Sequence, residues 1–190
     1  MILKYIEENS TIGNDIVKVD TFINQQIDPV IMDAFANEFA LYFRNKKIDR
    51  VITIEAGGIA PAVLTALKLN VPLTVIKKES SKLMTDVYTS TVHSFTKNKT
   101  YDLCVNKHNL DQNESVLFID DFLANGHAFM AAKDIVEQSG SNITSVGILI
   151  EKSFQSGRQK IEALEIDILS VARITKLSEE NGIEWFEEDC

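Results

Sequence analysis

Short apolar runs alternate with helical segments along most of this chain, and that alternation is its most constraining feature. The apolar runs, several of them β-branched, predict buried strands at 51–54, 73–76, 116–119, 143–150 and 166–169. Segments typical of helices lie at 29–45, 59–69, 126–138 and 155–164. Strands that alternate with helices favour an α/β fold with a central, mainly parallel sheet and right-handed crossovers.

The remaining segments carry fewer signals. The first long helix has a clear start, because Asp28 precedes Pro29 and these residue types are favoured at the cap and at the first helical position. A short helix is predicted at 2–8 and a strand at 101–105. The stretch 77–100 is rich in Ser and Thr and lacks a strong period, which indicates a loop or a hairpin.

Length and composition narrow the class of protein. A chain of 190 residues is long enough for one domain of ~150 residues, or two at most. Hydrophobic residues make up 45% and charged residues 25%, ordinary globular values that exclude low-complexity disorder. No uncharged apolar run approaches the ~20 residues that cross a bilayer. An acidic N-terminus and only two cysteines argue against a signal peptide and a disulfide framework, so we expect a cytoplasmic protein without a membrane partner.

The net charge of −9 bears on the partners. An acidic protein repels the nucleic-acid backbone, so we expect no broad DNA- or RNA-binding surface. A small phosphate site remains compatible with this charge, because helix N-termini and turns of backbone N–H groups bind phosphate without net positive charge.

The most informative stretch runs from the predicted strand at 116–119 into a helix. Two acids, Asp120 and Asp121, follow the strand, and a turn of small residues at 124–128 precedes the helix. Adjacent carboxylates repel each other, and a sugar with two vicinal hydroxyls is one reason to hold both at the ligand-binding end of a parallel strand. The turn suits a phosphate. The pattern favours a ribose 5-phosphate site; the alternative is a strand-end cap, a solvated acid and an ordinary turn.

This order of apolar residues, paired acids and a small-residue loop resembles the phosphoribosyl diphosphate (PRPP) signature of the type I phosphoribosyltransferases. The resemblance makes Asp120 and Asp121 the catalytic pair that holds the ribose. The family's usual loop reads Ala-Thr-Gly-Gly-Thr, and the residues implied here to bind PRPP are Ala124, Asn125, Gly126, His127 and Ala128. Asn125 can replace a threonine hydroxyl as a polar contact, whereas the missing final threonine leaves one donor fewer.

Further segments resemble the bacterial members of this family that act on xanthine, in the same order and spacing. They lie at 18–29, 55–62, 118–126 and 150–158. The resemblance therefore spans nearly the whole chain. It implies a single domain in which a small hood, from about 1–28 and 150–190, covers the base, and a mobile lid at about 79–98 covers the active site.

The resemblance implies an enzyme of purine salvage. It would transfer the 5-phosphoribosyl group from PRPP to N9 of xanthine, and it would release xanthosine 5′-monophosphate and pyrophosphate. Mg²⁺ would bind through PRPP without a dedicated protein cage, and the chain would form a homodimer. Two alternatives stay open: a phosphoribosyltransferase for guanine, hypoxanthine or adenine, and a non-catalytic PRPP-sensing regulatory domain.

The resemblance also assigns a pyrophosphate site. Its loop consists of Glu55, Ala56, Gly57 and Gly58, which follow one predicted strand, and Lys77 and Lys78 follow another. Glycines let the backbone approach an anion closely. In this family a non-proline peptide bond of the loop is often strained, and we expect it between Ala56 and Gly57. The alternatives are a plain strand-to-helix turn and two solvated lysines.

Base recognition is assigned, again by resemblance, to Asn24, Lys152 and the backbone near Val17. An ammonium donor and a carboxamide suit xanthine, which presents carbonyl groups at C2 and C6, whereas adenine would present an amine to Lys152. A loop asparagine and a surface lysine are the alternatives. No metal-ligand spacing is found among His93, His108, His127, Cys104 and Cys190, so no protein-held metal is expected.

Overall fold

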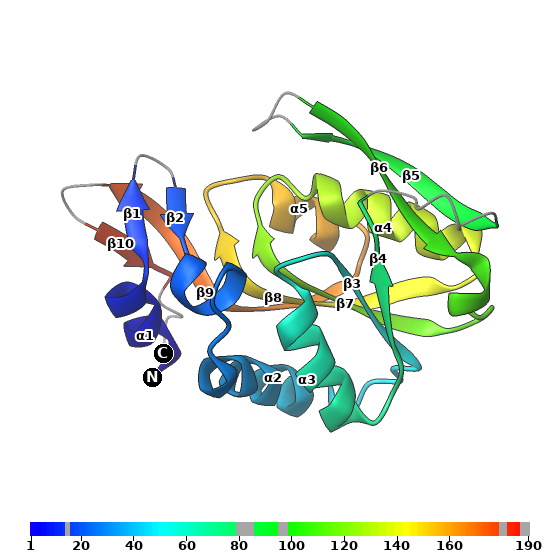
Figure 1. Ribbon diagram of the computed structural model, residues 1–190, viewed down its shortest axis with the longest axis horizontal. Coiled ribbons are helices and arrows are strands. Elements are labelled where there is room, and N and C mark those ends of the chain that lie inside the picture. The colour runs from blue at the N-terminus through cyan, green and yellow to red at the C-terminus, as the bar shows by residue number, and fades with distance from the viewer. Residues whose placement is uncertain (14–15, 79–85, 95–98, 179–181, 187–190) are drawn as a thin grey trace.

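The computed structural model describes residues 1–13, 16–78, 86–94, 99–178 and 182–186 (Figure 1). Its helices are α1 Ile2–Asn9, η1 Asp20–Asn24, α2 Pro29–Phe43, α3 Ile59–Leu69, η2 Lys107–Asn109, α4 His127–Gln138 and α5 Gly157–Glu162. Its strands are β1 Thr11–Gly13, β2 Ile16–Lys18, β3 Arg50–Ile54, β4 Leu73–Ile76, β5 Val87–Ser94, β6 Lys99–Asn106, β7 Ser115–Leu123, β8 Asn142–Lys152, β9 Asp167–Ser178 and β10 Gly182–Trp185. No helix in these ranges is long and apolar enough to cross a membrane.

A six-stranded sheet forms the centre of the molecule, in the order β10-β9-β8-β7-β3-β4. Its neighbouring strands are parallel except for the edge pair β9–β10. Helices α2 and α3 cover one face, and α4, α5 and the β5–β6 ribbon cover the other (Figure 1). The predicted α/β architecture is confirmed.

The connections around β3 and β7 create a crevice at the carboxyl ends of the strands. From β3 the chain crosses through α3 to β4 on one side, and from β7 it crosses through α4 to β8 on the other. Ligands bind at such points, where the strand order reverses. The last register pair between β3 and β7 is Thr53–Ile119, so β7 is no longer paired with β3 from Asp120 onward.

Strand β7 runs further than the sequence predicts. The prediction that it stops at Ile119 was wrong, because β7 continues to pair with the long strand β8 up to Leu123, which lies opposite Glu151. Both acids therefore belong to the strand. Pairing with β8 holds this part of β7 on one side, and the crevice lies on the other side.

The elements α1, β1 and β2 lie beside β10 at one end of the sheet (Figure 1). Ile12 packs against the same core cluster as Ile183 and Trp185, and the Trp185 indole donates to Glu7. The strands β1, β2 and β10 were not predicted. That these elements form a hood over the base, as the resemblance implies, stays a prediction.

The β5–β6 ribbon confirms the hairpin reading of 77–100 within the described residues. Its strands are antiparallel from Val87–Asn106 to Ser94–Lys99, and the strand predicted at 101–105 is part of β6. Gln138 of α4 donates to the backbone oxygen of Thr89 at 2.9 Å, which ties the ribbon to the helix below. Much of the lid predicted at 79–98 lies outside the described residues.

Candidate active site

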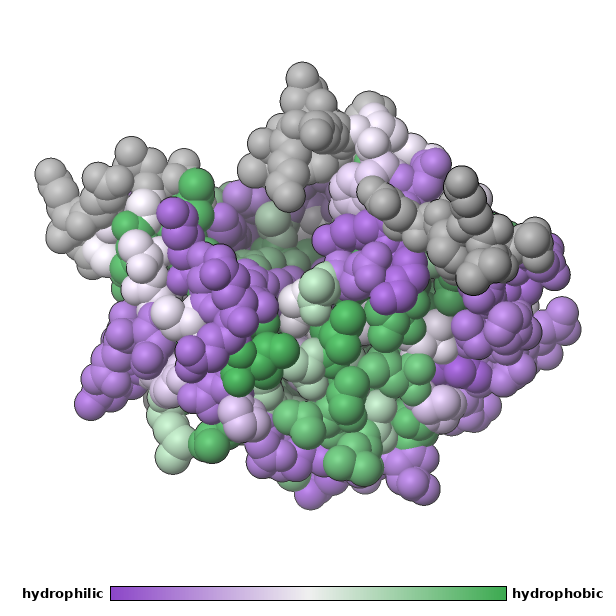
Figure 2. All heavy atoms as spheres, in the orientation of Figure 1, coloured by the Kyte–Doolittle hydropathy of each residue, from purple (hydrophilic) through white to green (hydrophobic). Residues whose placement is uncertain are grey.

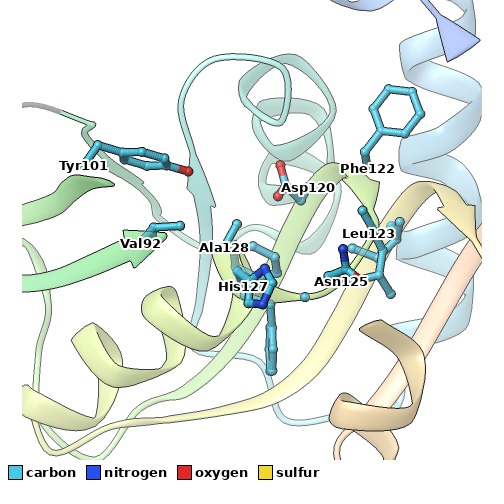
Figure 3. A pocket seen from close by; sticks show the side chains of 13 residues that line it. Val92, Tyr101, Asp120, Phe122, Leu123, Asn125, His127 and Ala128 are labelled. Atoms are coloured by element: carbon cyan, nitrogen blue, oxygen red, sulfur yellow. The ribbon is translucent and has the colours of Figure 1, made fainter. Parts of the chain in front are cut away.

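Two cavities meet in the crevice between β3 and β7, and they share Tyr101, Asp120 and Ala128. The first lies over the turn between β7 and α4 (Figure 3). The second lies over the turn after β3 and reaches Asn24 and Lys78. Figure 2 shows the surface hollowed between the packed chain ends and the β5–β6 ribbon. The described structure thus brings together parts of the chain that are separated by about a hundred residues.

Asp120 and Asp121 form the floor of the crevice. Both are half-buried, and their carboxylates accept the next backbone N–H: Asp121 N lies 3.0 Å from Asp120 Oδ1, and Phe122 N lies 2.9 Å from Asp121 Oδ1. Burial and the neighbouring Asp121 carboxylate raise the pKa of Asp120 well above its ordinary value. Ligand hydroxyls that donate hydrogen bonds would stabilise the ionised form of this pair.

The turn at 124–128 lines the first cavity along its whole length. Gly126 precedes α4 in the left-handed region, with φ of 76°, and no side chain caps the helix within the described residues. The first N–H groups of a helix lack intrahelical partners and favour an anion. Burial and the charge of Lys160 lower the pKa of His127, which favours the neutral ring.

The turn after β3 lies against the two acids. A side chain on Gly57 would collide with the Asp121 carboxylate, and one on Gly58 would collide with Thr53 and approach Asp120 Oδ1 to 3.2 Å. Only glycine therefore allows this loop to lie so close to β7. The loop leads directly into α3, which also has no side-chain cap.

The unusual peptide bond of this loop is one residue earlier than expected. The cis peptide bond joins Glu55 and Ala56, so its placement between Ala56 and Gly57 was wrong. The turn begins as β3 ends at Ile54, and the two glycines of the loop allow its close approach to the acids.

The side chains of the two lysines after β4 have different contacts. Lys77 Nζ donates to Glu55 Oε2 at 2.8 Å, and the backbone N–H of Lys78 donates to Glu55 Oε1 at 2.7 Å. Burial raises the pKa of Glu55, but these hydrogen bonds and both lysine charges outweigh burial and lower it. The side chain of Lys77 is thus engaged with the loop, whereas Lys78 lines the cavity.

Of the three residues assigned to the base, Asn24 is the one that lines the described crevice. Asn24 ends η1 and lines the cavity with Gly57 and Asp121. Val17 lies in β2 with its side chain in the core, so its backbone is what a ligand could reach. Lys152 is the last residue of β8, beside Ile174 of β9, and it is not among the residues that line these two cavities.

Several side chains that line the first cavity were missed by the sequence analysis. Val92 and Tyr101 reach the first cavity from the β5–β6 ribbon, and Phe122 lines it from β7 (Figure 3). Burial and the Asp120 carboxylate raise the pKa of the Tyr101 hydroxyl. Tyr101 carries no local motif, and only the packing of the ribbon on α4 places it there.

The described residues contain no group of three or more His, Cys, Asp and Glu side chains that could hold a metal ion. The carboxylates that line the second cavity belong to Glu55, Asp120 and Asp121.

Comparison with known proteins identifies the family. Residues 22–178 match the phosphoribosyl transferase domain. The chain is 44% identical to a xanthine phosphoribosyltransferase of Listeria monocytogenes over 192 residues, which cover 100% of this chain and 99% of that protein. It is also 44% identical to xanthine phosphoribosyltransferase 1 of Clostridium botulinum, over 92% of each chain.

Solved structures share the fold. An adenine phosphoribosyltransferase from Trypanosoma brucei, in complex with AMP, pyrophosphate and ribose-5-phosphate, superposes with a TM-score of 0.80 at 20% identity, over 95% of this chain and 83% of that one. The corresponding enzyme of Giardia lamblia, complexed with 9-deazaadenine, gives 0.78 at 24% identity, over 93% and 99%.

Proposed function

Because the chain belongs to the phosphoribosyl transferase domain family, we propose that it transfers the 5-phosphoribosyl group of PRPP to N9 of xanthine. The products are xanthosine 5′-monophosphate and pyrophosphate, as in purine salvage. The observation that carries the proposal is the position of Asp120 and Asp121, between an uncapped helix N-terminus and a glycine loop. The helix N-terminus, the acids and the glycine loop suit the 5-phosphate, the ribose and the pyrophosphate of PRPP, respectively.

In this proposal, PRPP lies across the crevice from the turn at 124–128 to the loop at 55–58. Its 5-phosphate lies on the turn at 124–128, where backbone N–H groups and the start of α4 favour an anion. Its ribose hydroxyls donate to Asp120 and Asp121. Its pyrophosphate lies against the loop at 55–58, with Lys78 as a positive charge.

The transfer needs no side-chain nucleophile. N9 of the purine forms a bond to C1′ while the bond from C1′ to the pyrophosphate oxygen breaks, and the proton of N9 passes to solvent water. Positive charge develops on the ribose ring in the transition state, because the bond to pyrophosphate breaks before the bond to N9 is fully formed. The carboxylates of Asp120 and Asp121 lie where they stabilise this charge, because fixed charges in a water-poor crevice act strongly.

Mg²⁺ accompanies PRPP in this proposal. Hard cations of this kind prefer oxygen ligands and keep several waters, which agrees with a crevice whose donors are carboxylates. The ion would be held mainly by oxygens of PRPP, with Asp120 and Asp121 as the adjoining protein groups, and it would supply charge neutralisation for the departing pyrophosphate.

The choice of xanthine rests on the relatives and on donor chemistry. Two relatives that are 44% identical over most of the chain are xanthine phosphoribosyltransferases. Lys152 and Asn24 supply an ammonium group and a carboxamide, and the backbone near Val17 completes the base site. An ammonium group can donate only, so it suits the carbonyl groups of xanthine and not the amine of adenine.

A homodimer in the cytoplasm is part of the same proposal. Exposed apolar side chains gather on α2 and α3, namely Val30, Leu41, Val63 and Leu67, and Figure 2 shows apolar surface where Figure 1 places α3. Val30 and Leu41 are eleven residues apart and thus share a helix face, as do Val63 and Leu67. We call these four residues the α2–α3 face and propose that a second copy covers it.

The purified chain should be assayed with PRPP and Mg²⁺ against xanthine, guanine, hypoxanthine and adenine in turn. We expect the highest kcat/KM with xanthine, and xanthosine 5′-monophosphate as the product. A higher kcat/KM with another base would replace xanthine by that base. No turnover with any of the four would leave a PRPP-binding domain without this activity.

A further inference from the structure

Two carbonyl oxygens of the phosphate-binding turn are held from behind by α5. The backbone N–H of Gly157 donates to the oxygen of Ala124 at 3.0 Å. Lys160 Nζ donates to the oxygen of Asn125 at 2.7 Å. Neither Gly157 nor Lys160 is among the residues that line the cavity, so both contacts are made outside it.

The direction of these carbonyls fixes the direction of two N–H groups. In a planar trans peptide the C=O and the following N–H point in opposite directions. The oxygens of Ala124 and Asn125 point to α5, and the N–H groups of Asn125 and Gly126 therefore point away from it, toward the cavity. An anion site needs this arrangement, because a carbonyl turned inward would repel phosphate.

The charge of Lys160 makes the N–H group of Gly126 a stronger hydrogen-bond donor. A hydrogen bond from an ammonium group to a carbonyl is stronger than a neutral one, and it polarises the same peptide so that its N–H becomes a better donor. The ammonium group also lies close enough to His127 to lower the pKa of that ring, which supports its position beside the turn.

Helix α5 is itself anchored to the sheet. Arg158 donates to the Glu151 carboxylate through Nε at 2.9 Å and Nη2 at 2.7 Å, and Glu151 is 1% exposed. Burial raises the pKa of Glu151, but hydrogen bonds from Arg158 and from the Ser153 and Ser170 hydroxyls lower it more, so the pair is ionised. A side chain on Gly157 would collide with the Ala124 oxygen and Leu123, so glycine is what lets α5 approach the turn.

We propose that α5 is a positioning element for substrate binding, in which Lys160 and Gly157 aim the N–H groups of Asn125 and Gly126 at the 5-phosphate of PRPP. The inference rests on the proposed function, since it takes this turn as the phosphate site. Lys160 does not touch the substrate; it acts through the backbone of Asn125.

The test is the affinity for ribose 5-phosphate, measured by titration calorimetry on Lys160→Met, which keeps the apolar stem and loses the ammonium group. Lys160→Arg restores a charged donor. Lys46→Met is the control, because Lys46 pairs with Asp167 at 3.0 Å, precedes the first residue of β3 and lines neither cavity. It changes the net charge by the same amount.

We expect Lys160→Met to weaken ribose 5-phosphate binding about tenfold, with Lys160→Arg and Lys46→Met within about threefold of the wild type. In the PRPP and xanthine assay, the KM of PRPP should rise while kcat and the KM of xanthine stay within about twofold. Unchanged ribose 5-phosphate binding by Lys160→Met, or equal weakening by Lys160→Arg, would overturn the inference. A wild-type chain that binds ribose 5-phosphate but does not turn over xanthine would contradict the proposed function alone.

Discussion

Asp120 lies half-buried beside a second carboxylate, and both circumstances raise the pKa of its side chain. A carboxyl group whose pKa is higher in the folded than in the unfolded chain lowers stability as it ionises. Its favourable contribution is complete below the unfolded pKa and is lost as the pH rises through the folded pKa. The position is therefore held at the expense of stability, as expected of a group that awaits a ligand.

Asp120→Asn should stabilise the protein while it reduces activity. Asparagine keeps an acceptor oxygen for Asp121 N and removes the buried charge. We expect no gain in Tm near pH 4 and a gain that grows toward pH 7–8, about 2–4 °C for each kcal/mol in a chain of this length. Thermal unfolding across this pH range measures it. A variant that is less stable than the wild type at pH 7 would show that Asp120 does not carry the unfavourable charge.

Lys152→Ala tests the base assignment. Loss of a charge-assisted hydrogen bond is worth ~1.5–3 kcal/mol, which lowers kcat/KM for xanthine about tenfold to a hundredfold. The loss should be larger for xanthine than for hypoxanthine if Lys152 meets the C2 oxygen, and equal if it meets the C6 oxygen. The KM of PRPP should not change. Wild-type activity on xanthine would make Lys152 an ordinary surface lysine.

At the scale of the elements, the loop at 55–58 can lie against β7 only because Gly57 has no Cβ atom. In Gly57→Ala, the added methyl group would occupy the place of the Asp121 carboxylate, which must move away from the ribose. We expect kcat/KM for PRPP to fall by at least about a hundredfold, with the far-UV circular dichroism spectrum unchanged.

The control for this variant is Gly13→Ala in β1, where an added methyl group meets nothing within 4 Å. It should keep wild-type kcat/KM for PRPP. If Gly57→Ala is as active as Gly13→Ala, the loop does not hold PRPP against Asp121.

Elements with local signals could be predicted from the sequence, and elements made by tertiary contacts could not. Helix α2 begins where expected because Asp28 caps it, with Oδ1 2.8 Å from Val30 N. The strands β1, β2 and β10 have three or four residues, too few for a period to show. The same holds for the site. The acids and both turns lie in short continuous segments and could be predicted. Tertiary packing alone brings Tyr101 of the β5–β6 ribbon to the cavity and α5 to the turn at 124–128.

At the scale of the whole molecule, the α2–α3 face predicts self-association. Leu67 is 74% exposed, and a second copy would remove it from water. Leu67→Glu should raise the dissociation constant of the dimer by at least about tenfold, as measured by analytical ultracentrifugation. The control is Leu164→Glu, the same change after α5 on the other side of the sheet. A wild-type chain that stays monomeric at high micromolar concentration would contradict the dimer.

The most direct test of the whole account is the rate of xanthosine 5′-monophosphate formation by the double variant Asp120→Asn, Asp121→Asn. Both side chains keep their size and lose the charge that is proposed to hold the ribose and stabilise its cationic transition state. We predict that kcat/KM for PRPP falls by about a hundredfold or more, while Tm stays at or above that of the wild type. A folded double variant with near wild-type kcat/KM for PRPP would contradict the assignment of the reaction to this site.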